Sequence, residues 1–139
     1  IYWGVGLPTD NGGFSIRTEN YKIMAGSPGI TTIKSKTNKM PESRRDSVCV
    51  FEGMFDFFAC RAMFPDVEIL DCIILHGARN WRKIKREDYS HIIYFCDNDK
   101  EGDKTKENLI KQGFTLNDKR DWYSNFKDVD EFYNKEYRK

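Results

Sequence analysis

The chain has 139 residues, 39% hydrophobic and 14% aromatic, which suffices for one packed domain with a real core but not for two. That composition excludes an intrinsically disordered chain, and a net charge of +1 gives no overall sign of a polyanionic partner. No apolar run approaches the roughly 20 residues that span a bilayer, and no signal-peptide pattern is present. We therefore expect a soluble protein without a membrane partner. The chain begins at Ile1 instead of methionine, which fits a domain of a longer protein.

The sequence contains few residues typical of a zinc site. Its four cysteines are Cys49, Cys60, Cys72 and Cys96. None forms a Cys-x-x-Cys pair or lies at ligand spacing from a histidine, and three lie in apolar runs where free cysteine acts as a small core residue. We predict reduced thiols and a cytoplasmic location. The two histidines, His76 and His91, flank predicted strands and are expected to make structural hydrogen bonds.

Residues 1–33 contain short β-forming runs that are separated by glycine-rich turns at 8–13 and 26–29. We expect these runs to form a small antiparallel unit. The polar stretch that follows, at 34–47, carries five basic residues, and its composition favours a connection over a strip of phosphate contacts. Residues 1–46 are therefore predicted to be an N-terminal β subdomain with a basic connection.

From residue 47 onward, strand-like and helix-like patterns alternate. Strands are predicted at 48–51, 72–75, 92–96 and, as a short fourth one, 114–116. Helices are predicted at 54–64, about 101–112 and 129–137. Uninterrupted β-branched and aromatic runs suit strands that are buried on both faces, and strands that alternate with helices form parallel sheets. Residues 47–139 are thus predicted to be an α/β domain with a parallel sheet of about four strands flanked by helices.

Acidic side chains follow two predicted strands and precede the last helix. The six residues are Glu52, Asp56, Asp97, Asp99, Asp128 and Asp130. Because the carboxyl ends of neighbouring parallel strands lie close together, we expect Glu52 to meet the Asp97/Asp99 pair. Carboxylates crowded in this way repel one another unless a divalent cation neutralises them. The pattern therefore predicts a site for a hard cation such as Mg²⁺.

Simpler structural roles stay open for several of these residues. The run at 97–99 also suits an ordinary turn before a helix, and Asp128 or Asp130 suits a helix N-cap as well as a metal ligand. The basic run at 79–86 suits either a groove for nucleic acid or a plain exposed helix.

Two motifs resemble the signatures of the Toprim fold, which occurs in DnaG-type primases, topoisomerases and some nucleases. Residues 50–56 (VFEGMFD) are similar to its strand-ending Glu-Gly motif with the downstream Asp of the primase branch, and residues 94–102 (YFCDNDKEG) to its Asp-x-Asp motif. Residues 127–130 (KDVD) resemble a third primase element, and 12–28 the subdomain that precedes Toprim in primases. The resemblance covers nearly the whole chain and looks closest to primase-like proteins of plasmids, phages and mobile elements.

The resemblance implies a Rossmann-like Toprim sheet and a Mg²⁺- or Mn²⁺-dependent nucleotidyltransferase. Its partners would be single-stranded DNA and nucleoside triphosphates, and its product an RNA primer for the replication or mobilisation of DNA. All six acids would surround one or more ions, with Glu52, Asp97 and Asp99 as catalytic residues and Glu52 as either ligand or proton acceptor. The residues expected to bind nucleotide or nucleic acid are Arg17, Lys22, Gly53, Arg79, Arg82 and Lys83.

Two other functions stay open. A metal-dependent DNA nuclease of the Toprim class would use the same acids, whereas no tyrosine stands in a recognisable topoisomerase context. A non-catalytic module that binds nucleic acid or a replication partner is disfavoured, because clustered carboxylates are costly without a metal. The zinc-binding module and the helicase that accompany such regions in primases are not among these residues and would belong to a longer parent chain.

Overall fold

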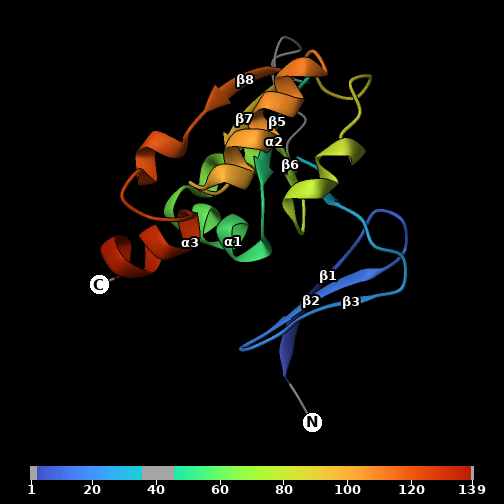
Figure 1. The fold of residues 1–139 in the computed structure, drawn as a ribbon. Helices are drawn as coiled ribbons and strands as arrows, with labels where there is room; N and C mark the ends of the chain where they lie inside the picture. The colour runs from blue at the N-terminus through green and yellow to red at the C-terminus, as the bar shows by residue number, and fades with distance from the viewer. Residues whose placement is uncertain (1–2, 36–45, 139) are drawn as a thin grey trace.

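The computed structural model describes residues 3–35 and 46–138 (Figure 1). Its main element is a five-stranded sheet with the strand order β4-β6-β5-β7-β8. Four strands are parallel: β5 (Ser47–Phe51), β6 (Asp71–Ile74), β7 (His91–Phe95) and β8 (Thr115–Asp118). These strands confirm the predicted α/β sheet. A fifth strand, β4 (Thr31–Ile33), pairs antiparallel with β6 at the edge and was not predicted there.

Helices connect the parallel strands. The α-helices are α1 (Met54–Met63), α2 (Lys100–Lys111) and the short α3 (Val129–Phe132), which continues as a π turn, η5 (Tyr133–Tyr137). The remaining segments are 3-10 turns: η2 (Pro65–Ile69), η3 (Ala78–Lys83) and η4 (Arg120–Tyr123). The three predicted helices are therefore present, and the basic run begins as a 3-10 turn. Among the described residues, no helix is long and apolar enough to cross a membrane.

The large sheet is buried on both faces, which explains its uninterrupted apolar strands. On one face, Val50 and Tyr94 pack with Leu109 of α2. On the other face, Phe51 and Phe95 stack with ring centroids 5.0 Å apart and pack with residues of α1 and α3. All four cysteines are free and buried, as predicted for small core residues.

A separate three-stranded antiparallel sheet is formed by β1 (Gly4–Pro8), β2 (Phe14–Thr18) and β3 (Lys22–Ala25), and Figure 1 shows it set apart from the larger sheet. It confirms the predicted small β unit. Arg17 and Lys22 are cross-strand partners and therefore share one face of this sheet. Most of the predicted basic connection, residues 36–45, lies outside the described residues, and the boundary at residue 46 stays a prediction.

Candidate metal centre

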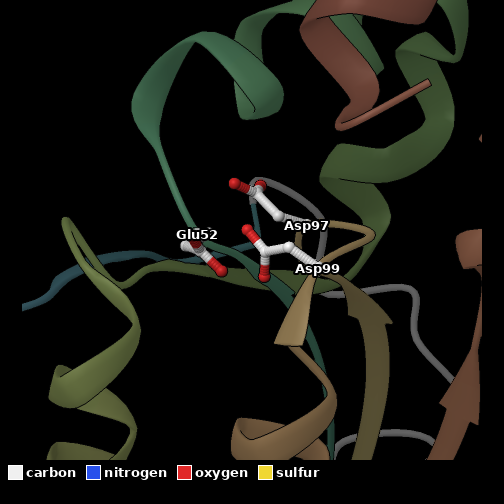
Figure 2. Close-up of side chains that lie close together, drawn as sticks. All are labelled: Glu52, Asp97 and Asp99. Atoms are coloured by element: carbon white, nitrogen blue, oxygen red, sulfur yellow. The ribbon is translucent and has the colours of Figure 1, made fainter. Parts of the chain in front are cut away.

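The acidic side chains meet at the carboxyl edge of the large sheet. Phe51 and Phe95 are register partners on neighbouring parallel strands, so the residues that follow them leave the sheet at the same edge. Carboxylate oxygens of Glu52, Asp97 and Asp99 lie within 4.8 Å of one another (Figure 2). This spacing allows one hard cation to contact all three residues.

A second acidic group shares Asp97 with the first. Carboxylate oxygens of Asp56, Asp97 and Asp128 also lie within 4.8 Å of one another, because the first turn of α1 and the start of α3 approach the same edge. Asp130 belongs to neither group, although it lines the same cavity of about 200 Å³. Its side chain accepts a hydrogen bond from Asn134 Nδ2 at 3.0 Å.

Three of these acids also hold backbone groups in place. Asp99 is the N-cap of α2 and accepts from Gly102 N at 2.7 Å, and Asp128 is the N-cap of α3 and accepts from Glu131 N at 2.8 Å. Asp56 accepts from Gly53 N at 3.3 Å and from Asp130 N at 3.1 Å. The N-cap expected of Asp128 or Asp130 is thus Asp128. In both N-caps a single oxygen is engaged, which leaves the other available for a cation.

The electrostatics of the cluster fit a divalent cation. Among the described residues, Oε1 of Glu52 and Oδ1 of Asp97 are buried without a hydrogen-bond partner. Burial and the neighbouring charges of Glu52 and Asp56 raise the pKa of Asp97 to about 9. Burial and then the charge of Asp128 raise the pKa of Asp56 to about 7, and burial raises the pKa of Glu52. A bound cation would replace the protons that the crowded carboxyl groups otherwise retain.

Two basic residues of the small sheet stand over the acidic cavity. Arg17 and Lys22 both line it, together with the backbone of Gly53. The Arg17 guanidinium lies over the Phe55 ring, 5.6 Å from its centroid. Burial and the charge of Arg17 lower the pKa of Lys22. A cavity that is lined by carboxylates and by two basic side chains suits an anionic ligand that contacts a metal ion, such as a phosphate group.

His76 joins the small sheet to this edge, a role that its place after a strand did not reveal. Among the described residues it is the one non-glycine residue with positive φ, at 57°. Its carbonyl accepts from Lys22 Nζ at 2.5 Å. Its Nε2 lies 2.7 Å from Oγ1 of Thr31, whose hydroxyl donates to the Pro8 carbonyl, so Nε2 is the donor. The expected structural hydrogen bond therefore exists, and the His76 carbonyl also fixes the Lys22 ammonium.

Asn98, between the two aspartates, organises the loop that leads to Asp128. Its Nδ2 donates to the carbonyls of Tyr123 and Phe126, both at 3.0 Å, and its backbone N donates to the Lys127 carbonyl at 2.7 Å. A single sequence shows only an Asp-Asn-Asp turn, because these acceptors are backbone groups that carry no residue-type signal.

Replacing Asn98 by alanine should lower the free energy of unfolding by about 1–3 kcal/mol, because the carbonyls of Tyr123 and Phe126 lose their donor. Urea denaturation measures the change. Asn125→Ala is the matched control, since Asn125 is exposed in the same loop and should shift the value by less than about 0.5 kcal/mol. Equal stability of the Asn98 and Asn125 variants would contradict the assigned role.

The basic residues predicted in the run at 79–86 separate into two places. Arg79 and Arg82 line a groove against α2, whereas Lys83 lines a different cavity beside β4 and donates to the Pro28 carbonyl at 2.9 Å. Lys104 of α2, which the sequence did not single out, lies in the groove with the two arginines. Its position is a tertiary effect, since an exposed lysine on a helix gives no signal of its own.

Comparisons with known proteins agree with this geometry. No curated protein matches the chain. The primase fragment of the bacteriophage T7 primase-helicase protein has the same fold, with a TM-score of 0.64 and 19% identity over 96% of this chain; the chain spans 57% of that fragment. A putative protein from Aquifex aeolicus has a TM-score of 0.46 and 24% identity, over 65% of this chain and 88% of that one. The model of the Toprim-like family matches residues 49–133, which is more than half of the chain and includes all six acids. The chain therefore belongs to the Toprim-like family.

Proposed function

We propose that the chain is the catalytic core of a primase-like nucleotidyltransferase that extends RNA primers on single-stranded DNA, in the replication or mobilisation of DNA. This proposal rests on one observation: two three-residue groups of carboxylates share Asp97, in a cavity that the basic side chains of Arg17 and Lys22 also line. The fold shared with a phage primase fragment supports it. Because the chain spans 57% of that fragment, recognition of the template is assigned to the parent protein, with a helicase or zinc-binding module as partner.

Five of the acidic residues would hold metal ions in this proposal. Glu52, Asp97 and Asp99 would hold one Mg²⁺ or Mn²⁺ ion, and Asp56 and Asp128 would join Asp97 in holding a second. Such ions neutralise the charge of the phosphates and lower the pKa of the attacking 3′-hydroxyl. The roles of the chain's own groups are to bind and to orient, and Glu52 is either ligand or proton acceptor.

The basic residues supply the phosphate contacts. Lys22 is fixed by the His76 carbonyl and Arg17 by its packing on Phe55, so both can bind the triphosphate without a large loss of side-chain entropy. Gly53 keeps the edge of the cavity open, since an added Cβ there would lie 3.3 Å from Asp56 Oδ2. Asp130 is a supporting residue in this proposal, because its backbone N–H orients Asp56.

The test supplies the protein with a short RNA primer annealed to a DNA template, ribonucleoside triphosphates and Mn²⁺ or Mg²⁺. Primer extension that is lost in Glu52→Gln and in Asp97→Asn is the expected result. The same reactions are run with end-labelled single- and double-stranded DNA. Metal-dependent scission without extension would replace the proposal with a Toprim nuclease, and inactivity in both assays would leave only a binding module.

A further inference from the structure

A second concave surface begins beside the metal centre. The η3–α2 groove, of about 360 Å³, lies between η3 and α2 and is lined by three cationic side chains, Arg79, Arg82 and Lys104, and by one acidic side chain, Glu101. All three cations are exposed, and none has an ion-pair partner in the part of the chain that the structure describes. The groove therefore presents a net positive surface next to a strongly acidic cavity.

The two walls of the groove, η3 and α2, both begin at the carboxyl edge of the large sheet, where the acidic side chains meet, and extend away from it. Gly77, which lines the acidic cavity, is the N-cap of η3, and Asp99, a residue of the first acidic group, is the N-cap of α2. Glu101, at the near end of the groove, lies in the first turn of α2, two residues after Asp99. The groove is thus continuous with the place where the proposed reaction occurs.

The shape of the walls favours a phosphate backbone over a stacked base or an apolar partner. Trp81 is half-buried against the core, and the Arg82 guanidinium covers its ring at 5.4 Å, so this ring offers no free stacking face. Thr105 and Asn108, on α2, add polar groups. Guanidinium groups pair well with phosphate oxygens, and a group of cations along a groove binds a polyanion without regard to sequence.

We propose that the η3–α2 groove binds the phosphate backbone of single-stranded nucleic acid on its way to or from the metal centre. The inference rests on the proposed function only where it takes the metal centre as the place to which the bound strand leads. Lys83 is excluded from this path, because it lines the cavity on the β4 side. The groove adds Lys104 to the residues that contact nucleic acid.

The test measures binding of fluorescein-labelled oligothymidylate by anisotropy, in EDTA, over a range of NaCl concentrations. The triple variant Arg79→Gln, Arg82→Gln, Lys104→Gln should bind about tenfold or more weakly. Its slope of log K against log salt should shrink by about 2, since each lost contact to a single strand removes about 0.7. The double variant Arg79→Lys, Arg82→Lys keeps the charge and should retain most of the binding.

The matched control removes the same charge elsewhere, with Lys119→Gln at the N-cap of η4 and Lys135→Gln and Arg138→Gln in the C-terminal segment. It should change affinity by less than about threefold, because distant surface charges are screened. If both triple variants lost affinity for oligothymidylate equally, or if the salt slope of the groove variant were unchanged, the proposal for the groove would be overturned. Displacement of the oligonucleotide by an equal charge concentration of polyglutamate would also overturn it, in favour of a general anion site.

The groove and the proposed function can fail separately. Binding in EDTA does not require the metal centre, so Asp97→Asn should bind oligothymidylate like the wild type while it loses primer extension. If the groove variant binds oligothymidylate normally and the wild type extends primers, only the proposal for the groove is wrong. If the groove variant loses binding and the wild type shows no metal-dependent activity, only the proposed enzymatic function is wrong.

Discussion

Asp97→Asn is expected to stabilise the metal-free protein and to remove the stabilisation that Mn²⁺ or Mg²⁺ gives to the wild type. Asp97 is 8% exposed, its Oδ1 lacks a partner among the described residues, and it belongs to both acidic groups. Without metal, the amide relieves a cost on the order of 1–3 kcal/mol, because it is neutral without taking up a proton and its N–H groups can donate to the neighbouring carboxylates. With metal at about 1,000 times its Kd, the wild type gains about 4.1 kcal/mol, which the variant forgoes and which exceeds the cost of the free carboxyl group.

Thermal melting in EDTA and in Mn²⁺ measures both effects. The expected result is a change of order: the variant melts above the wild type in EDTA and below it in Mn²⁺. Asp121→Asn, an exposed aspartate in η4, is the control and should follow the wild type in both buffers. A metal-induced rise in Tm that survives in Asp97→Asn would place the ion elsewhere.

The same cluster sets the pH dependence of the metal-free protein. In the folded state, the pKa of Asp97 is raised to about 9 and that of Asp56 to about 7, against about 3.9 in an unfolded chain. The folded state therefore binds more protons between these limits, and its stability falls as pH rises from 4 towards 9. His76 acts in the opposite direction, because burial lowers its pKa to about 4 and its contribution is lost as pH falls from 6.5 to 4. Melting in EDTA should thus decline from pH 6.5 to 9, and this decline should flatten in Asp97→Asn.

Gly102→Ala is expected to be the most disruptive single substitution at the site. An added Cβ would lie 2.0 Å from the Asp97 carbonyl oxygen, which is a backbone atom and cannot rotate away. Gly102 is also held on both sides, since its N donates to Asp99 Oδ1 at 2.7 Å and its carbonyl accepts from Tyr94 Oη at 2.6 Å. Relief of the clash must therefore move the start of α2 or the aspartate loop. We expect a loss of about 3 kcal/mol or more in unfolding free energy, beyond ordinary overpacking.

Guanidinium denaturation measures this loss, and melting with Mn²⁺ shows whether the surviving fold still binds metal. Gly6→Ala is the control, because Gly6 is exposed and an added Cβ there would meet only ordinary contacts, the nearest at 3.5 Å. It should change stability by less than about 1 kcal/mol. Wild-type stability of Gly102→Ala would show that the loop after β7 can shift freely.

The sequence predicted that the acidic side chains meet at one edge of the sheet better than it predicted what surrounds them. Glu52, Asp97 and Asp99 follow long apolar strands, so the parallel sheet alone dictates that they meet. The strand β4 was not placed in the large sheet, because its three residues pair with β6, some 40 residues further along the chain, and local patterns hold no record of that pairing.

The separation of the basic residues has a geometric reason. An α-helix would place Arg79, Arg82 and Lys83 on one side, since residues three and four apart are neighbours there. In the 3-10 turn η3, residues three apart lie in line, so Arg82 stays with Arg79 while Lys83 is turned away. Single-sequence patterns distinguish poorly between these two helix types, and the groove therefore depends on a distinction that only the three-dimensional structure supplies.

The position of β4 has a consequence for how the protein can be divided. Because β4 covers the outer side of β6, it satisfies backbone groups that would otherwise form an open edge of apolar character. A polypeptide cut at residue 47 would lose this cover and gain a template for intermolecular strand pairing. The Toprim-like half would then self-associate, so the N-terminal residues protect against aggregation and also supply the basic side chains of Arg17 and Lys22.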